Sequence, residues 1–249
     1  MNMNIIFFTS MLFVSCSPLQ AKPLISGASR QFNSLSKDYN EASRVLPEAR
    51  IFTIMIDPAG DAKTTGRQLD DSFERGITLQ CAQRLQQQLE AKFPAVKVIL
   101  TRMPGETVHE LQNASFANRM AIDLYLSVHF FKEHETVPRF YIYSYALGED
   151  CVIKPIELSF YRYDQAHLLN QKNTQIWGQL FKETLIQSSF NKQFQYQGVF
   201  SLPFKPLVGI KAPALACEIG LKNKERWQQC IEPLIEALQA VITQACRAI

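Results

Sequence analysis

The stretch Ile51-Phe52-Thr53-Ile54-Met55-Ile56-Asp57-Pro58-Ala59-Gly60-Asp61 decides the fold class of this chain. Its first six residues form a largely apolar run with β-branched members, which is typical of a strand covered on both faces. Turn-forming residues end the run. In a parallel α/β sheet, polar residues that follow such strands meet at one edge, where ligands bind. Asp57 and Asp61 are therefore candidates for a functional site.

The segments that follow alternate between helical and strand patterns. Apolar residues at every fourth position predict a helix that Pro94 ends: Phe73, Ile77, Cys81, Leu85, Leu89 and Phe93. The same criteria predict strands over residues 96–101, 123–129, 139–145 and 214–218, and helices over residues 108–120, 165–188 and 224–248. Residues 150–163 fit either a strand or a loop. This order predicts a single α/β domain with a mostly parallel twisted sheet flanked by helices.

The N-terminal region has the pattern of an export signal. Residues 5–14 form an apolar run that is too short to span a bilayer, and Ser15-Cys16-Ser17-Pro18 follows it. We interpret residues 1–21 as a signal peptide, cleaved after Ala21, or alternatively as a lipoprotein signal that leaves a membrane anchor on Cys16. A buried first element of the fold is a third interpretation. We expect an exported protein of the periplasm or cell envelope, which the second interpretation would anchor to the membrane through a lipid.

Composition limits the class of protein further. The 249 residues are 47% hydrophobic and 20% charged, and a chain of this length can bury one sizeable core. Residues 22–49 are rich in Ser, Asn and Lys and predict a linker, so the folded domain is expected over residues 50–249. The net charge of +3 comes from scattered Lys and Arg, which excludes the basic stripe of a nucleic-acid binder. The sequence does not indicate an oligomeric state.

The cysteines do not have the paired close spacing of a zinc site: Cys16, Cys81, Cys151, Cys217, Cys230 and Cys246. Cys81 and Cys217 lie in apolar patterns and are expected in the core. A disulfide between Cys230 and Cys246 is an open alternative, because export would permit one and sequence alone does not set the pairing.

Polar residues occur at several predicted element ends. Glu74 opens the first predicted helix, His129 ends a predicted strand and Glu218 ends the last one. Carboxylate and imidazole groups held at neighbouring strand ends can bind zinc and its water, while a further carboxylate accepts the water proton. Each residue also has a structural interpretation: a helix N-terminal acid for Glu74, a core histidine for His129, a solvent-facing charge for Glu218 and a turn residue for Asp61.

Five blocks of sequence occur in one order along the chain: Met55-Ile56-Asp57-Pro58-Ala59-Gly60-Asp61, Phe73-Glu74-Arg75, Val98-Ile99-Leu100-Thr101-Arg102, Ile122-Asp123-Leu124-Tyr125-Leu126-Ser127-Val128-His129 and Pro213-Ala214-Leu215-Ala216-Cys217-Glu218-Ile219-Gly220. In these blocks the chain resembles the zinc-dependent N-acetylmuramoyl-L-alanine amidases of the type 3 class. Those enzymes remove peptide stems from peptidoglycan. The resemblance extends from Ile51 to the C-terminus.

The resemblance implies a role for each matching residue. Glu74 and His129 would be zinc ligands, and Glu218 the catalytic carboxylate that handles the water proton. The family's third ligand, a histidine, falls on Gly60, and Asp61 is the nearest replacement ligand in the sequence. An anionic ligand there would make zinc-bound water less acidic, so we expect slower hydrolysis. Asn113, in place of the family's usual Arg, also indicates an altered substrate groove.

Three functional hypotheses remain at this point. The first is a zinc amidase that cleaves the bond between N-acetylmuramic acid and L-Ala. The second is an inactive pseudo-amidase that binds peptidoglycan or a cell-division partner, because a centre with two protein ligands rarely holds zinc tightly. The third is an exported hydrolase of another specificity, and the absence of a Gly-x-Ser-x-Gly motif argues against a serine version of it.

Overall fold

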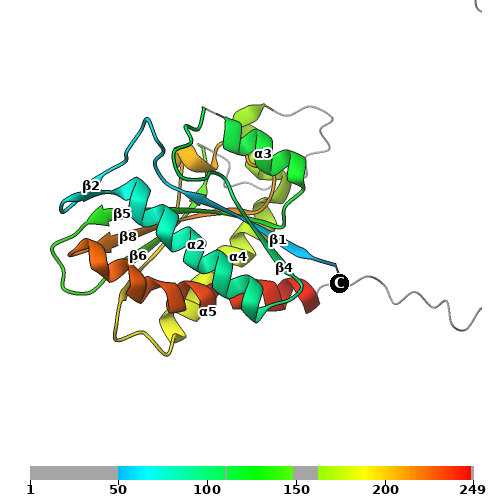
Figure 1. Ribbon diagram of the computed structural model, residues 1–249. Helices are drawn as coiled ribbons and strands as arrows, with labels where there is room; N and C mark the ends of the chain where they lie inside the picture. Colours follow the sequence, from blue (N-terminus) through cyan, green and yellow to red (C-terminus); the bar gives the residue numbers. More distant parts are fainter. Residues whose placement is uncertain (1–49, 110, 148–161, 248–249) are drawn as a thin grey trace, which may run out of the picture. The chain divides into compact units, whose positions relative to one another are not determined.

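A computed structural model describes residues 50–109, 111–147 and 162–247 of the chain (Figure 1). The predicted signal over residues 1–21 with Cys16, the predicted linker over residues 22–49 and most of the unassigned stretch 150–163 lie outside the described residues. Among the helices of the described residues, none is long and apolar enough to cross a membrane.

A six-stranded sheet in the order β4-β1-β5-β8-β6-β7 forms the centre of the fold. Its strands are β1 (Phe52–Pro58), β4 (Val96–Leu100), β5 (Leu124–Lys132), β6 (Arg139–Tyr145), β7 (Gln195–Leu202) and β8 (Ala214–Leu221). Strands β4, β1, β5 and β8 are parallel, and β6 is antiparallel to β8 while pairing in parallel with β7. The predicted fold class, an α/β domain with a mostly parallel sheet, is therefore confirmed.

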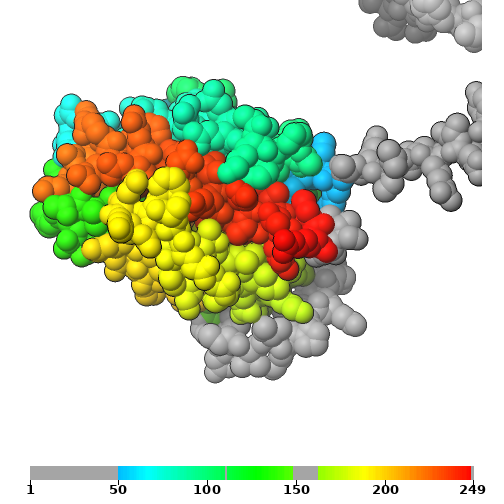
Figure 2. Space-filling view, turned by 90° about the horizontal axis from the view of Figure 1, so that it is seen from below, coloured from blue at the N-terminus to red at the C-terminus, as the bar shows by residue number. Residues whose placement is uncertain are grey.

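Helices cover the two faces of the sheet unequally. Helices α2 (Glu74–Lys92), α4 (Gln171–Gln187) and α5 (Ile231–Arg247) lie on one face and enclose the larger core (Figure 1). Figure 2 looks onto this layer, in which α5 lies beside α4. The other face carries α3 (Gln112–Met120) and the short 3-10 helix η2 (Lys205–Leu207), which pack on a smaller apolar cluster.

The alternation of side chains along each strand sorts residues between these two faces. In β5, Leu124, Leu126 and Val128 enter the larger core. The residues between them therefore point to the face that carries α3, which we call the site face. By the same alternation Asp57, His129 and Glu218 all belong to the site face, because their strand neighbours Ile56, Val128 and Cys217 lie in the larger core.

Several predicted boundaries differ from the observed ones, and three strands were not predicted. The predicted helices over 165–188 and 224–248 each begin with a 3-10 segment, η1 (Tyr163–Asn170) and η3 (Lys224–Cys230). The small hairpin of β2 (Gln68–Leu69) and β3 (Ser72–Phe73) also escaped prediction. Strand β7 was not predicted, because its sequence lacks apolar alternation. It is an edge strand with mostly exposed residues and a central Gly198.

The cysteines are unpaired in the described residues. Cys81 and Cys217 are fully buried in the core, as predicted, and burial raises the pKa of the Cys81 thiol to about 12. The suggested disulfide between Cys230 and Cys246 is wrong: both are free thiols, Cys230 inside the core and Cys246 exposed.

Substitutions on two helices test the assignment of the larger core. Leu85→Ala, at a fully buried position on α2, should lower the free energy of unfolding by about 2–5 kcal/mol, because it removes apolar contacts and leaves a cavity. Ile186→Ala, at a position on α4 that is 53% exposed, should change it by less than about 0.5 kcal/mol. Urea unfolding measures both, and equal losses would contradict this core.

Candidate functional site

The turn after β1 is held in place by neighbouring elements. The Ala59 N–H donates to the carbonyl of Val128 at 3.0 Å, and Thr78 Oγ1 on α2 donates to the Ala59 carbonyl at 2.7 Å. The buried Arg102 guanidinium donates to the carbonyls of Pro58 and Ala59 at 3.0 and 3.2 Å. The turn is therefore fixed to β5, to α2 and to the segment after β4.

Gly60, in the place where the resemblance implies a ligand histidine, has no room for a side chain. Its φ is +75°, in the left-handed region that favours glycine. A Cβ atom built on it would lie 2.8 Å from the Cβ of Arg75 and 3.1 Å from the carbonyl oxygen of Thr64. A histidine at this position would require the turn and α2 to move apart.

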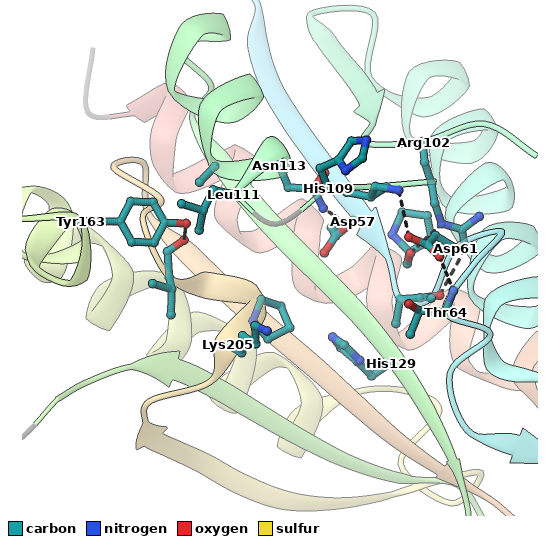
Figure 3. A pocket seen from close by; sticks show the side chains of 17 residues that line it. Asp57, Asp61, Thr64, Arg102, His109, Leu111, Asn113, His129, Tyr163 and Lys205 are labelled. Carbon is teal, nitrogen blue, oxygen red and sulfur yellow. Dashed lines mark hydrogen bonds between the residues drawn. The ribbon is translucent and has the colours of Figure 1, made fainter. Parts of the chain in front are cut away.

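Asp61 serves the turn in this structure. One carboxylate oxygen accepts the backbone N–H groups of Lys63 and Thr64, and the other accepts that of Val108 at 2.9 Å. The hydrogen bond from Thr64 is the main cause that lowers the pKa of Asp61, and burial opposes it. Figure 3 shows this side chain directed toward Thr64 rather than toward His129. Asp61 therefore does not join the other predicted ligands.

Glu74 and His129 do lie together. The Glu74 carboxylate is 3.3 Å from Nδ1 of His129, and it also accepts the backbone N–H groups of Phe130 at 3.1 Å and Arg67 at 2.9 Å. Burial raises the pKa of Glu74, but the hydrogen bonds from His129 and Arg67 outweigh burial, so its pKa lies below the ordinary value. Gly66 permits the close approach of this loop, since a Cβ there would lie 2.7 Å from Oε2 of Glu74.

The other ring nitrogen of His129, Nε2, contacts the hydroxyl of Ser127. Its Nε2 lies 2.9 Å from Ser127 Oγ, which donates to the buried Asp57 carboxylate at 2.9 Å. Thr101 and Asn113 donate to the other oxygen of Asp57. The contact between Ser127 Oγ and Nε2 orients the imidazole ring. This contact leaves Nδ1 as the nitrogen that faces Glu74, as in many metal-binding histidines.

Glu218 is partnered by a positive charge from the chain itself. It pairs in register with His129 across β8 and β5, and its Oε1 lies 2.5 Å from Nη2 of Arg67. The Arg67 guanidinium also lies over the ring of Phe131, 5.6 Å from its centre. Burial and, to a smaller degree, the neighbouring Glu218 raise the pKa of Tyr143 to about 12. Glu218 is thus held between a guanidinium and a tyrosine hydroxyl.

The donor set does not fit the three-ligand zinc centre that the resemblance implies. Glu74 and His129 supply two donors, Gly60 supplies none and Asp61 is occupied by backbone N–H groups. Among the residues that the structure describes, no three His, Cys, Asp or Glu side chains lie together as a metal site would need. Zinc sites in proteins have three or four protein ligands, so the described side chains lack at least one.

A cavity of about 640 Å³ opens beside these residues on the site face (Figure 3). Asp57, Gly60 and His129 line it together with three basic side chains, Arg102, His109 and Lys205. Neither Arg67 nor Lys205 was predicted as a site residue, since both come from irregular segments without a pattern. Ser127 could have been found, because strand alternation places it on the same face as His129.

Alanine substitutions at two glycines test whether the Gly60 turn is closed to side chains. Gly105 has a φ of +83° and open space around a built Cβ, so Gly105→Ala should cost about 1–2 kcal/mol of unfolding free energy from backbone strain alone. Gly60 has a similar φ, but a Cβ there would also clash with the Cβ of Arg75. Gly60→Ala should therefore cost about 1–3 kcal/mol more unfolding free energy than Gly105→Ala. Equal losses in urea unfolding would show that the turn yields easily.

The pH dependence of stability tests the role of Asp61. Asp61→Asn should lower the unfolding free energy at pH 7 by about 1–2 kcal/mol, because one backbone donor loses its acceptor. Folding lowers the pKa of Asp61, so the carboxylate stabilises the fold above its ordinary pKa of 3.8 and loses this effect as pH falls through the folded-state pKa. The difference from the unsubstituted protein should therefore shrink below pH 3.8. Glu135→Gln, at an exposed ion pair with Arg139, should change stability by less than about 0.5 kcal/mol throughout.

Comparison with known proteins agrees with this fold. A curated relative, the N-acetylmuramoyl-L-alanine amidase CwlM of Bacillus licheniformis, is 34% identical over 76 residues, which span 30% of this chain and 30% of that protein. The catalytic domain of CwlV from Bacillus (Paenibacillus) polymyxa has a similar fold, with a TM-score of 0.55 and 13% identity over 77% of this chain and 98% of that one. The N-acetylmuramoyl-L-alanine amidase AmiC2 of Nostoc punctiforme is also similar, with a TM-score of 0.55 and 16% sequence identity. The match covers 78% of this chain and 99% of that one.

The family match extends over most of the chain and includes every residue of the site. The model of the family described as N-acetylmuramoyl-L-alanine amidase, Amidase_3, matches residues 54–241. That range contains the turn after β1, the Glu74 and His129 pair and Glu218. The chain therefore belongs to the Amidase_3 family of N-acetylmuramoyl-L-alanine amidases.

Proposed function

We propose that this protein binds peptidoglycan through the site face without cleaving it by the zinc-dependent reaction. The observation that carries the proposal is the closed turn at Gly60, which leaves Glu74 and His129 without a third ligand. The proposal takes the peptidoglycan substrate from the family and differs from the family only in the chemistry. It also places the protein in the periplasm or cell envelope, exported through residues 1–21 and, in one version, anchored through Cys16.

The state of Glu218 supports this proposal. A general base needs an oxygen that is available to the water it deprotonates. Here Oε1 of Glu218 forms an ion pair with Arg67 at 2.5 Å, and Arg67 is also held by its contact with Phe131. One oxygen of the residue expected to handle the proton is thus engaged in an ion pair.

The cavity supports a binding role. Lys205 and His109 line it together with the buried Arg102, whose guanidinium donates to backbone carbonyls, and the carboxylates of Asp57 and Asp61 line it as well. Peptide stems of peptidoglycan carry free carboxylates, and basic side chains are suited to bind them by charge-assisted hydrogen bonds. The volume of about 640 Å³ is typical of a ligand site rather than of a packing defect.

Hydrolysis of the bond between N-acetylmuramic acid and L-Ala is the second candidate function. It is favoured by the 3.3 Å separation of Glu74 and His129, by the hydrogen bond that turns Nδ1 toward Glu74, and by the register pairing of His129 with Glu218. This candidate requires a third zinc ligand that the described residues do not supply.

One set of measurements on the mature protein separates the two candidates. Co-sedimentation with purified sacculi, with and without EDTA, measures binding and its dependence on metal. Elemental analysis after dialysis against zinc measures the bound metal, and chromatography measures released peptide stems. We expect sacculus binding that EDTA leaves unchanged, well under one zinc per chain, and no released stems.

Glu218→Ala is the control variant for the chemistry. Stem release that EDTA abolishes and that Glu218→Ala also abolishes would overturn the proposal in favour of the amidase reaction. Failure of the unsubstituted protein to bind sacculi would also overturn it.

A further inference from the structure

Five aromatic rings form a continuous row on the site face, which we call the aromatic shelf: Phe131, Tyr141, Tyr143, Phe200 and Phe204. The ring centres are 5.9 Å apart from Phe131 to Tyr141 and 6.4 Å from Tyr141 to Phe200. They are 5.8 Å apart from Phe200 to Tyr143 and 5.1 Å from Tyr143 to Phe204, where the rings are nearly parallel at 7°. The shelf extends across β5, β6 and β7 to the residue before η2.

Two glycines give the shelf its shape. A Cβ at Gly220 would lie 3.0 Å from Cζ of Phe131, and a Cβ at Gly198 would lie 3.1 Å from Cζ of Phe200. Both rings therefore lie over bare backbone, which is a recurrent way in which sheets accommodate large aromatic side chains. The arrangement keeps these two rings close to the surface of the sheet.

The shelf is accessible although its neighbours are packed. Phe200 is 42% exposed, and the other four rings are half-buried, of which Tyr143 and Phe204 also pack against the smaller apolar cluster. On the opposite face the same strands are covered, because Phe140 and Ile142 enter the larger core beside α4. A row of partly exposed rings on one face of a sheet marks an interaction surface.

Polar groups border the shelf at the end nearest the predicted catalytic carboxylate. Tyr141 pairs in register with Glu218, and the Arg67 guanidinium lies over Phe131 at 5.6 Å. The two tyrosines add hydroxyl groups along the row. Rings with hydroxyls, a carboxylate and a guanidinium at the margin match the two sides of a pyranose, whose C–H face packs on aromatic rings while its hydroxyl and amide groups form hydrogen bonds.

We propose that the aromatic shelf binds the amino-sugar backbone of a glycan strand. This inference rests on the proposed function and adds to it a second subsite with a different ligand chemistry. The rings follow one another at 5.1 to 6.4 Å, so the whole shelf is long enough for more than one pyranose unit. The cavity with basic side chains then receives the peptide stem.

The two subsites meet at His129. The Phe204 ring packs edge-on against the His129 ring at 5.2 Å, and the next residues, Lys205 and Pro206, line the cavity. A glycan strand on the shelf therefore brings its branch point to the cavity. This continuity favours a peptidoglycan strand as the occupant over an unrelated protein partner.

Isothermal titration with two probes tests this inference on the mature protein. Chitotetraose carries amino sugars without peptide, and a stem tripeptide carries peptide without sugar. We expect chitotetraose to bind, and Phe200→Ala and Tyr141→Ala each to weaken its binding about tenfold, because each removes one stacking surface. Neither variant should change binding of the tripeptide, and Phe200→Trp should retain chitotetraose binding.

Ile186→Ala, an exposed apolar residue on α4, is the matched control and should leave both affinities unchanged. Thermal unfolding of each variant checks that the fold is intact. Sacculus binding without chitotetraose binding would overturn the shelf inference and leave the proposed function standing. Chitotetraose binding that the two alanine variants leave unchanged would also overturn it. Chitotetraose binding without sacculus binding would support the shelf as a sugar site and reject the proposed function.

Discussion

The site depends on the partnering of three buried carboxylates, those of Asp57, Glu74 and Glu218. A buried carboxylate is strongly unfavourable unless hydrogen bonds or opposite charges compensate it. Asp57 is compensated by neutral donors, Glu74 by an imidazole and two backbone N–H groups, and Glu218 by Arg67. Arg67 contributes to two of these contacts, with its backbone N–H to Glu74 and its guanidinium to Glu218. The loop that carries Arg67 is therefore fixed to the sheet.

The choice of partners separates this site from a zinc centre. A divalent cation and a guanidinium can both compensate carboxylates, but only the metal requires a third ligand in a set position. Placing a histidine at Gly60 means moving a turn that Thr78 and Arg102 hold. Removing Arg67 alone would leave Glu218 buried without its cation. Neither change by itself would create a centre with three protein ligands for zinc.

Sequence patterns predicted the scaffold better than the contacts within it. The strand patterns predicted His129 and Glu218 at strand ends, where they pair in register, and the helical stripe predicted Glu74 at the start of α2. Their chemical roles remain predictions. The role of Asp61 depends on the Val108 backbone, which is distant in sequence, so local patterns could not reveal it. Arg67 lies in a loop, and β7 is an exposed edge strand of the sheet. Neither segment has the apolar periodicity from which elements are predicted.

The alternation that collects the polar residues also collects the aromatic ones. Since β6 is antiparallel to β8 and in register with it at Glu218, Tyr141 and Tyr143 share the face of Glu218, and Phe200 of β7 joins them opposite Tyr143. Binding affinity for an extended polymer comes from a few well-placed aromatic and charged anchors spread over a surface, whereas a catalytic metal acts at one bond. Under the proposed function, a chain that lacks a zinc ligand retains its affinity for the polymer, because the aromatic shelf and the cavity that would bind it meet at His129.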